Sequence, residues 1–417
     1  MRLSNINTIE QHTLRGLYHR TKGDKVIWAA VVVLALVSLL VVYSSTGTLA
    51  YKMSKSTESY LFKQVMFIVF GMLVIYYLHK VNYKIYSQIA RLLFILSIPL
   101  LIYTLAFGVE LNKGSRWIRL PIIQMTMQTS DLAKLALFMY MSRLLSKKQD
   151  KIKDFKTGFL PIIIPVGIIC LLIAPANLST ALLIGATSLL IMFIGRVSMK
   201  HLLLTIGVAL IPVLILISAA VVQHRTADAD VAVRTEKSKI FTRLSTWVNR
   251  VESFIYGGKD ADDEDNYQVN QAKIAIAKGG WMGLGPGNSE QRNFLPHPYS
   301  DFIFAIIIEE YGLVGGTFIL FIYLIFLFRS IRIYKKCPYA FGAFLALALS
   351  FTLVIQALAN MAVNVNLFPV TGVTLPLISM GGSSFIFTCV SIGIILSVAR
   401  NVEQLEAVKT ETPAENQ

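Results

Sequence analysis

The residues that could carry chemistry in this chain are a few charged side chains beside long apolar segments. Asp301 lies in the string NFLPHPYSDFIFAIIIEEYG, where a proline-containing segment meets an apolar run. A carboxylate at such a junction can face water and could act as a general base. The alternative is structural, because Ser300 and Asp301 at the start of a helix can cap free backbone amides.

A basic segment could supply the complementary charge. Lys113, Arg116 and Arg119 lie between residues 109 and 131, a segment that is otherwise mostly apolar or uncharged. Such side chains could bind an anion. Loop charge without a ligand is the alternative, and this segment alone does not separate the two interpretations.

A second set of polar residues, Gln128, Asp131 and Lys134, lies in the string QTSDLAKLAL. Asp131 and Lys134 are three residues apart and therefore share a face of any helix that contains them. The spacing predicts an ion pair. This pair could be purely structural, or it could shape a binding site.

Other polar residues lie within apolar runs. Gln356, Asn360 and Asn364 recur every four residues, which predicts hydrogen bonds between helices or the wall of a cavity. Glu309 and Glu310 would be costly at membrane depth unless they are paired or face a cavity, so we expect them to face the protein interior.

The string NLFPVTGVTLPLISMGGSS, residues 366–384, contains prolines and glycines that rule out a regular helix. We expect a re-entrant loop, followed by a helix that begins near Ser383 and Ser384. The free amides at that helix start could hold a phosphate, and a simple capped turn is the alternative.

Apolar helices must position these residues. Of 417 residues, 55% are hydrophobic and 15% charged, and a soluble domain of this size would need more polar surface. A membrane-crossing helix needs about 20 apolar residues, and about ten runs approach that length. The predicted runs are 26–45, 61–79, 89–108, 132–145, 158–174, 178–195, 202–222, 302–328, 341–363 and 383–399. The predicted fold class is therefore an all-α polytopic membrane protein, with residues 1–417 forming a single domain.

Positive charge in short loops indicates the cytoplasmic side. Lys and Arg are concentrated in an N-terminal arm, 1–25, and in alternate loops, so we expect both termini in the cytoplasm, with a tail at 400–417. The other loops, including a long one at 223–301 between the seventh and eighth runs, are then outside. Within that loop, residues 240–255 predict an amphipathic helix in the membrane interface.

The charge and the cysteines exclude other classes. The net charge of +15 would suggest nucleic acid for a soluble protein, but here it follows membrane topology, so no nucleic-acid partner is expected. Cys170, Cys337 and Cys389 lie in or beside apolar runs without paired spacing. Neither a disulfide framework nor a zinc site is predicted.

Four strings resemble, in order, those of the SEDS family, the shape, elongation, division and sporulation proteins. They are GSRWIRL, QTSDLAKLALFMY, GWMGLGPGNSEQRNFLPHPYSDFIFAIIIEEYG and PVTGVTLPLISMGGSS. The segments GNSEQRNFLP and TLPLIS look more like the division branch of the family than the elongation branch. Asp131 stands where Glu is usual in the family, Thr129 replaces Pro, Asn177 replaces a common Asp, and Met380 replaces Tyr.

The resemblance implies a ten-helix peptidoglycan glycosyltransferase in the bacterial cytoplasmic (inner) membrane. Such proteins polymerise lipid II, an undecaprenyl-pyrophosphate-linked disaccharide, at the outer face. They work with a class B penicillin-binding transpeptidase and other division proteins. Asp301 matches the family's essential outer-loop aspartate, the expected general base, while Arg116 and Lys134 match its basic residues. A lipid II transporter (flippase) and a non-catalytic division scaffold are the alternatives.

The expected reaction needs positive charge near the pyrophosphate. The residues expected to bind the substrate are Arg116, Lys113, Arg119, Lys134, Gln128, Asp131, Ser383 and Ser384. A divalent cation, Mg²⁺ or Mn²⁺, could share the phosphate charge. The sequence shows no dedicated cluster of metal ligands, so no cofactor is assigned.

Overall fold

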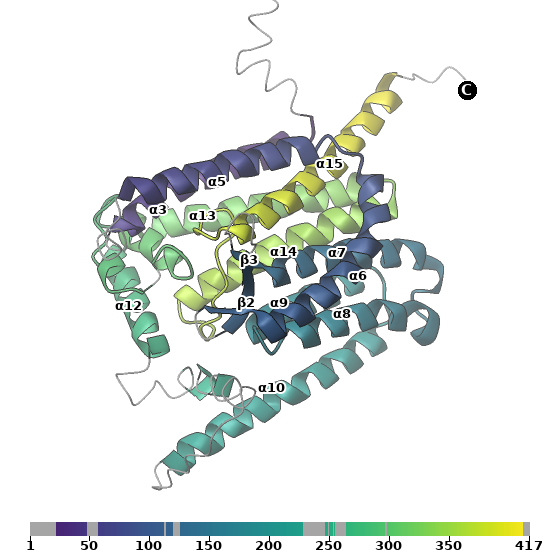
Figure 1. Ribbon diagram of the computed structural model, residues 1–417. Coiled ribbons are helices and arrows are strands. Elements are labelled where there is room, and N and C mark those ends of the chain that lie inside the picture. Colours follow the sequence, from purple (N-terminus) through teal and green to yellow (C-terminus); the bar gives the residue numbers. More distant parts are fainter. Residues whose placement is uncertain are drawn as a thin grey trace, which may run out of the picture.

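A computed structural model describes residues 22–47, 57–111, 114–119, 126–227, 247–248, 250–252, 254, 264–296 and 298–411 (Figure 1). The α-helices are α3 (Lys25–Ser45), α5 (Thr57–Leu78), α6 (Tyr83–Phe107), α7 (Thr129–Lys147), α8 (Leu160–Ile173), α9 (Leu178–Ile194), α10 (Met199–Ala227), α12 (Glu264–Gly279), α13 (Ile303–Lys336), α14 (Ala340–Asn364) and α15 (Ser383–Glu411). Short 3₁₀ or π turns lie at Gln149–Lys151, Phe155–Phe159 and Gln291–Asn293.

The described helices confirm a polytopic helical membrane protein. Eight of them are long and apolar enough to cross a bilayer, and α9 is a shorter apolar helix. The fourth predicted run corresponds to α7, whose interior-facing polar residues lower its hydropathy. The count of ten spans remains a prediction.

Helix α14 lies at the centre of the bundle and packs against α13, α7, α15 and α9 (Figure 1). In the most apolar stretch of α14, 78% of the residues are buried, compared with 17% in that of the peripheral α5. Small buried residues such as Gly342, Ala346 and Ser350 leave room for neighbouring groups, and at Gly342 the ring of Tyr83 occupies that room. The polar side chains of α14 are therefore held inside the protein.

The segment between α6 and α7 contains a small sheet that the sequence did not predict. Strands β1 (Val109–Leu111), β2 (Gly114–Arg119) and β3 (Thr126–Gln128) form an antiparallel sheet in the order β1-β2-β3. Trp117 pairs with Gln128, directly before α7. The sheet therefore sets the position of the first turn of α7.

Helix α13 is interrupted at Gly312, whose φ of 70° and ψ of −175° are not helical. The break leaves backbone groups without helical partners, and a turn at 280–285 satisfies them. The amides of Leu284 and Gly285 donate to the carbonyls of Glu309 and Glu310, at 2.9 and 3.0 Å, and the amide of Leu313 donates to Gly280 at 2.9 Å. The turn and the N-terminal part of α13 thus form one unit.

Substitution of Gly312 by Ala is expected to destabilise this unit strongly. A Cβ there would lie 2.1 Å from the carbonyl oxygen of Trp281, in a backbone region that side chains rarely adopt. We expect a loss of about 3 kcal/mol. Thermal unfolding in detergent measures it, with Gly167→Ala in α8 as the control, since nothing lies within 4 Å of that site. Equal melting temperatures for both variants would contradict this account.

Some expected boundaries differ from the structure. Helix α10 continues to Ala227, so the seventh helix extends into the segment expected as an outer loop from residue 223. Helix α15 continues to Glu411, beyond the run that was expected to end at 399. Helical hydrogen bonding persists past the apolar run in both cases, because backbone pairing does not depend on side-chain hydropathy. Within the segment 223–301, which was expected to lie outside, α12 packs on α13.

Candidate functional site

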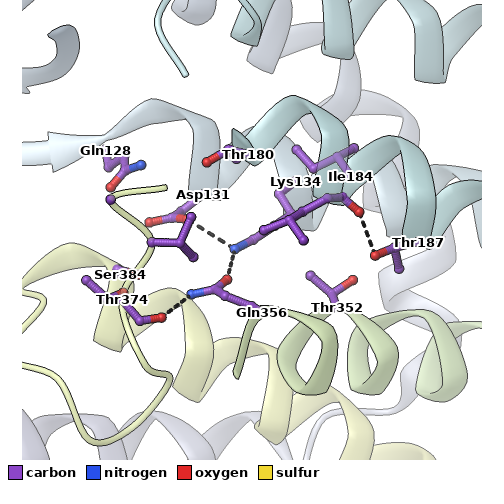
Figure 2. A pocket seen from close by; sticks show the side chains of 13 residues that line it. Gln128, Asp131, Lys134, Thr180, Ile184, Thr187, Thr352, Gln356, Thr374 and Ser384 are labelled. Carbon is purple, nitrogen blue, oxygen red and sulfur yellow. Dashed lines mark hydrogen bonds and ion pairs between the residues drawn. The ribbon is translucent and has the colours of Figure 1, made fainter. Parts of the chain in front are cut away.

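A polar pocket lies between α7, α9, α14 and the segment that precedes α15 (Figure 2). Its cavity volume of about 40 Å³ accommodates a few water molecules. Four of the predicted site residues contribute to it or to its rim. The polar residues lining it are Gln128, Asp131, Lys134, Thr180, Thr187, Thr352, Gln356, Thr374 and Ser384.

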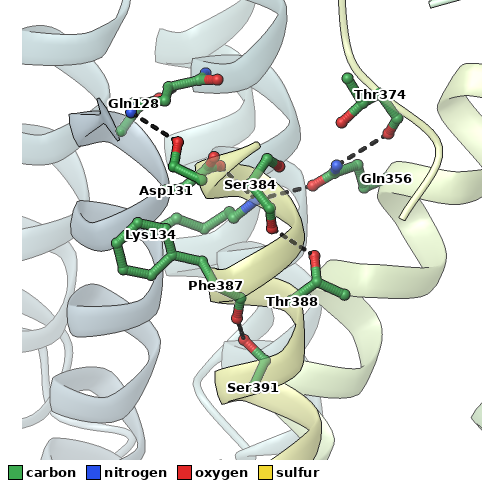
Figure 3. A network of polar contacts seen from close by, with 11 residues as sticks. Gln128, Asp131, Lys134, Gln356, Thr374, Ser384, Phe387, Thr388 and Ser391 are labelled. Carbon is green, nitrogen blue, oxygen red and sulfur yellow. Dashed lines mark hydrogen bonds and ion pairs between the residues drawn. The ribbon is translucent and has the colours of Figure 1, made fainter. Parts of the chain in front are cut away.

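Lys134 is the centre of the polar network in this pocket (Figure 3). Its Nζ donates to Asp131 Oδ1 at 3.2 Å and to Gln356 Oε1 at 2.8 Å. The predicted ion pair is therefore confirmed. Asp131 is 5% exposed, and its Oδ2 has no hydrogen-bond partner among the described residues. The network thus combines a buried carboxylate that is only partly satisfied with a lysine that faces the pocket.

Gln356 joins α14 to the segment before α15. Its Nε2 donates to the carbonyl of Thr374 at 3.0 Å, while its Oε1 accepts from Lys134 (Figure 2). The predicted hydrogen bonding along this face of α14 is confirmed.

The two serines at the start of α15 have different positions. Ser383 Oγ accepts from the backbone amide of Gln128 at 3.0 Å and so ties α15 to the last residue of β3. Ser384 is buried and lines the pocket. Its amide donates to Gly381 at 3.0 Å, as in a capped turn.

Asp301 lies beside the pocket and does not line it. The residue is partly exposed, and its carbonyl accepts from Asn360 Nδ2 at 2.8 Å. The same Asn360 amide donates to the carbonyl of Val373, a pocket residue, at 2.8 Å. One side chain of α14 therefore joins the Asp301 main chain to the pocket wall.

The Asp301 side chain does not cap α13, so the structural interpretation from the sequence is wrong. Phe302 occupies the N-cap position without a side-chain cap, and the amide of Ala305 donates to Asn364 Oδ1 at 3.0 Å. Asp301 Oδ1 accepts from the neighbouring Ser300 Oγ at 2.8 Å. Burial raises the pKa of Tyr299, and interactions with Tyr60 and with Asp301 raise it further.

A second buried polar cluster lies further along α13. Glu309 and Glu310 are 0% and 1% exposed, which confirms that they face the interior. Glu309 accepts from Ser289 Oγ and from the amides of Glu290 and Gln291, and Glu310 accepts from Ser44 Oγ. The Glu309 carboxylate holds the turn at residues 289–291 against α13. Neither glutamate lines the pocket.

The predicted basic residues are described only in part. Arg119 is exposed at the end of β2, where it pairs with Thr126. Arg116 lies in the same strand, but its side chain is outside the described residues, as is all of Lys113. Most of the predicted helix at 240–255 is also outside them. The sequence reasoning missed four threonines of the pocket, although the seven-residue spacing of Thr180 and Thr187 on one face of α9 could have indicated them.

Comparisons with known proteins identify the family. The sequence pattern of the FtsW/RodA/SpoVE family, described as cell cycle protein, matches residues 24–404. A protein of Geobacter sp. (strain M18) named probable peptidoglycan glycosyltransferase FtsW is 30% identical over 385 residues, which cover 91% of this chain and 98% of the relative. Stage V sporulation protein E of Bacillus subtilis is 29% identical, with coverage of 91% and 98%.

Solved structures have the same fold. A chain of a peptidoglycan synthase complex aligns with a TM-score of 0.69 at 22% identity, covering 92% of this chain and 99% of that one. The Rod shape determining protein RodA of Thermus thermophilus aligns with a TM-score of 0.61 at 21% identity, with coverage of 91% and 97%. The sequence thus led to the correct family. The chain belongs to the FtsW/RodA/SpoVE family of cell cycle proteins and is similar to its FtsW members.

Proposed function

We propose that this chain polymerises lipid II into glycan strands at the outer face of the bacterial cytoplasmic membrane during cell division, with Asp301 as general base. The chain is a peptidoglycan glycosyltransferase, the activity for which its FtsW relatives are named. Family membership and the position of Asp301 beside a polar pocket support the more specific reaction.

The availability of the Asp301 carboxylate carries the proposal. A carboxylate at the start of a helix usually accepts from the first amides of that helix. Here Asn364 takes the Ala305 amide, and Asp301 Oδ1 accepts from the hydroxyl of Ser300. A partly exposed carboxylate outside the capping role can accept a proton from a substrate hydroxyl.

In the proposed reaction, Asp301 takes the proton of a sugar hydroxyl on one lipid-linked disaccharide. The hydroxyl oxygen bonds to the anomeric carbon of a second one, and the bond to lipid pyrophosphate breaks, so that the pyrophosphate leaves with its electron pair. Positive charge stabilises this leaving group. Lys134 would supply it from the pocket, with Arg116, Lys113 and Arg119 of the β1–β3 segment at the outer side.

The pocket is too small for a disaccharide. Its volume suits a few waters, so a lipid-linked sugar would bind at the rim and place one phosphate or hydroxyl group near Lys134. Gln128, Asp131, Ser383 and Ser384 would shape that rim. A divalent cation, if one binds, would be held by Asp131, whose Oδ2 has no partner among the described residues, and would share the charge of the phosphates. No cluster of three or more His, Cys, Asp or Glu suited to a metal exists within the described ranges.

The proposed topology follows from the charge pattern. It has ten spans, both termini in the cytoplasm, and the long loop at 223–301 outside, with the interfacial helix at 240–255 near the lipid substrate. The partners are then the membrane, a class B penicillin-binding transpeptidase and other division proteins. The likeness to a chain from a peptidoglycan synthase complex supports a transpeptidase partner.

Purified protein with its transpeptidase partner and labelled lipid II tests the proposed function. We expect glycan strands, resolved on a gel, that a muramidase digests. Labelled lipid II crossing the bilayer of proteoliposomes without polymer would instead show a transporter. Neither polymer nor transport, with normal binding of the partner, would show a scaffold.

A further inference from the structure

The residues around Asp301 are held by a continuous row of hydrogen bonds to their carbonyl groups. The carbonyl of Tyr299 accepts from the amide of Met380 at 3.0 Å, and the carbonyl of Ser300 accepts from Ser379 Oγ at 2.7 Å. The carbonyl of Asp301 accepts from two side-chain amides of α14, at 2.8 and 3.0 Å. Three consecutive carbonyls are therefore fixed from elements more than 50 residues away.

Asn364 has two functions in this row. Its Nδ2 donates to the carbonyl of Asp301, and its Oδ1 accepts at 3.0 Å from the amide of Ala305 in the first turn of α13. That amide is shared, because it also donates to the carbonyl of Phe302 at 3.1 Å. It also donates to the carbonyl of Asn360, which keeps both side chains aligned. Asn360 and Asn364 are 1% exposed, so water does not compete for these bonds.

We propose that Asn360 and Asn364 are positioning residues for the reaction: both fix the main chain of Asp301, and Asn364 also accepts from a first-turn amide of α13 that the Asp301 carboxylate could otherwise cap. This inference rests on the proposed role of Asp301. While the carbonyl of Asp301 is held by the two asparagines, Oδ1 of its carboxylate accepts from Ser300 Oγ at 2.8 Å. The two asparagines need not touch the substrate.

The physical reason is competition for the first turn of α13. A helix start presents free amides that attract a nearby carboxylate. If Asn364 did not fill that place, Asp301 could turn toward the helix and would be both misplaced and stabilised as the anion. Misplacement by about 1 Å can reduce a rate about 100-fold.

Among the described residues, one charged group beside the segment that contacts Asp301 is Arg250, whose Nη1 donates to the carbonyl of Val370 at 3.3 Å. Helix α14 and residues 366–382 contain no ionisable side chain. Tyr299 interacts electrostatically with Asp301 and with Tyr60 of α5. Phenols ordinarily lose their proton only in the alkaline range, so tyrosines do not contribute to the acid limb of a pH–rate profile.

The test measures polymerisation and its pH profile for Asn360→Ala and Asn364→Ala in the complex with the transpeptidase. Ser350→Ala is the matched control, because Ser350 is buried in α14 and its hydroxyl, as far as the described residues show, bonds only to the carbonyl of Ala346 in its own helix at 2.6 Å. We expect rates about 10- to 100-fold lower for the asparagine variants. We also expect an acid limb at lower pH for Asn364→Ala, and parental behaviour for the control.

Two results would overturn the inference. One is a parental rate and profile in both asparagine variants when they are folded; the other is a lower rate of Asn364→Ala with an unchanged acid limb, which a purely structural role would give. If Asn364→Ala does not fold, Asn360→Ala is the deciding variant. A rate about 10- to 100-fold lower with a melting temperature near the parental value supports the inference, and a parental rate overturns it. Asp301→Asn is assayed in parallel. Full polymerisation by this variant overturns the proposed role of Asp301 together with the inference. An inactive Asp301→Asn variant beside asparagine variants with parental rates overturns the inference alone.

Discussion

Asp301→Asn is expected to abolish most glycan polymerisation while leaving the protein folded. The amide keeps the size of the side chain but cannot take a proton from the attacking hydroxyl. General-base catalysis contributes about 10²- to 10⁴-fold, so we expect a loss in that range. Stability should change little, because the carboxylate accepts from Ser300 and does not cap α13. The gel assay with labelled lipid II measures the rate, and thermal unfolding measures the fold.

Glu290→Gln is the matched control for this variant. Glu290 lies with Asp301 in the segment 223–301, and its exposed side chain pairs with Lys278. Exposed pairs contribute about 0 to 1 kcal/mol, so its loss should leave both rate and stability near the parental values. Polymer made at the parental rate by Asp301→Asn would remove Asp301 as the base. An equal loss in both variants would indicate a general effect of negative charge at the outer face.

Lys134→Met is expected to reduce both stability and activity. Met keeps most of the length and the apolar stem but removes the donor to Asp131 and Gln356. Asp131 would then be a buried carboxylate without a counter-charge, which costs about 3 to 5 kcal/mol. The partial exposure of the lysine, 15% for its side chain, favours the lower end of that range. Thermal unfolding in detergent measures the loss.

The double variant Asp131→Asn, Lys134→Met separates the two functions of the lysine. With both charges removed, the stability penalty should largely disappear, because no unpaired carboxylate remains. Polymerisation should stay low, since the pocket then lacks the cation proposed to face the pyrophosphate. Recovery of both stability and polymerisation in the double variant would show that Lys134 only neutralises Asp131.

The sequence was most informative where contacts are local. The spacing of Asp131 and Lys134 predicted their ion pair, because three residues along a helix place two side chains on one face. The four-residue spacing on α14 predicted its polar face for the same reason. Apolar runs predicted the helices, since bilayer thickness sets their length.

Contacts between distant segments could not be predicted in this way. The sequence left Asp301 between a cap and a catalytic base, and the structure excludes the cap because Asp301 accepts from Ser300 while Asn364 accepts from the Ala305 amide. The break at Gly312 was also missed, because it depends on a turn more than 25 residues earlier that supplies the missing hydrogen bonds. The sheet between α6 and α7 consists of strands too short to show an alternating pattern.

Side-specific labelling tests the central claim, that Asp301 and the basic β2 segment face the same outer compartment. Single cysteines replace Asp301, Arg119 or Lys151 after Cys170, Cys337 and Cys389 are removed, and a membrane-impermeant maleimide is added to intact cells without an outer-membrane barrier. Lys151 is exposed in the loop predicted to be cytoplasmic. The account predicts labelling at 301 and 119 without permeabilisation, and at 151 only after it. Labelling of 301 and 119 from opposite sides would contradict it.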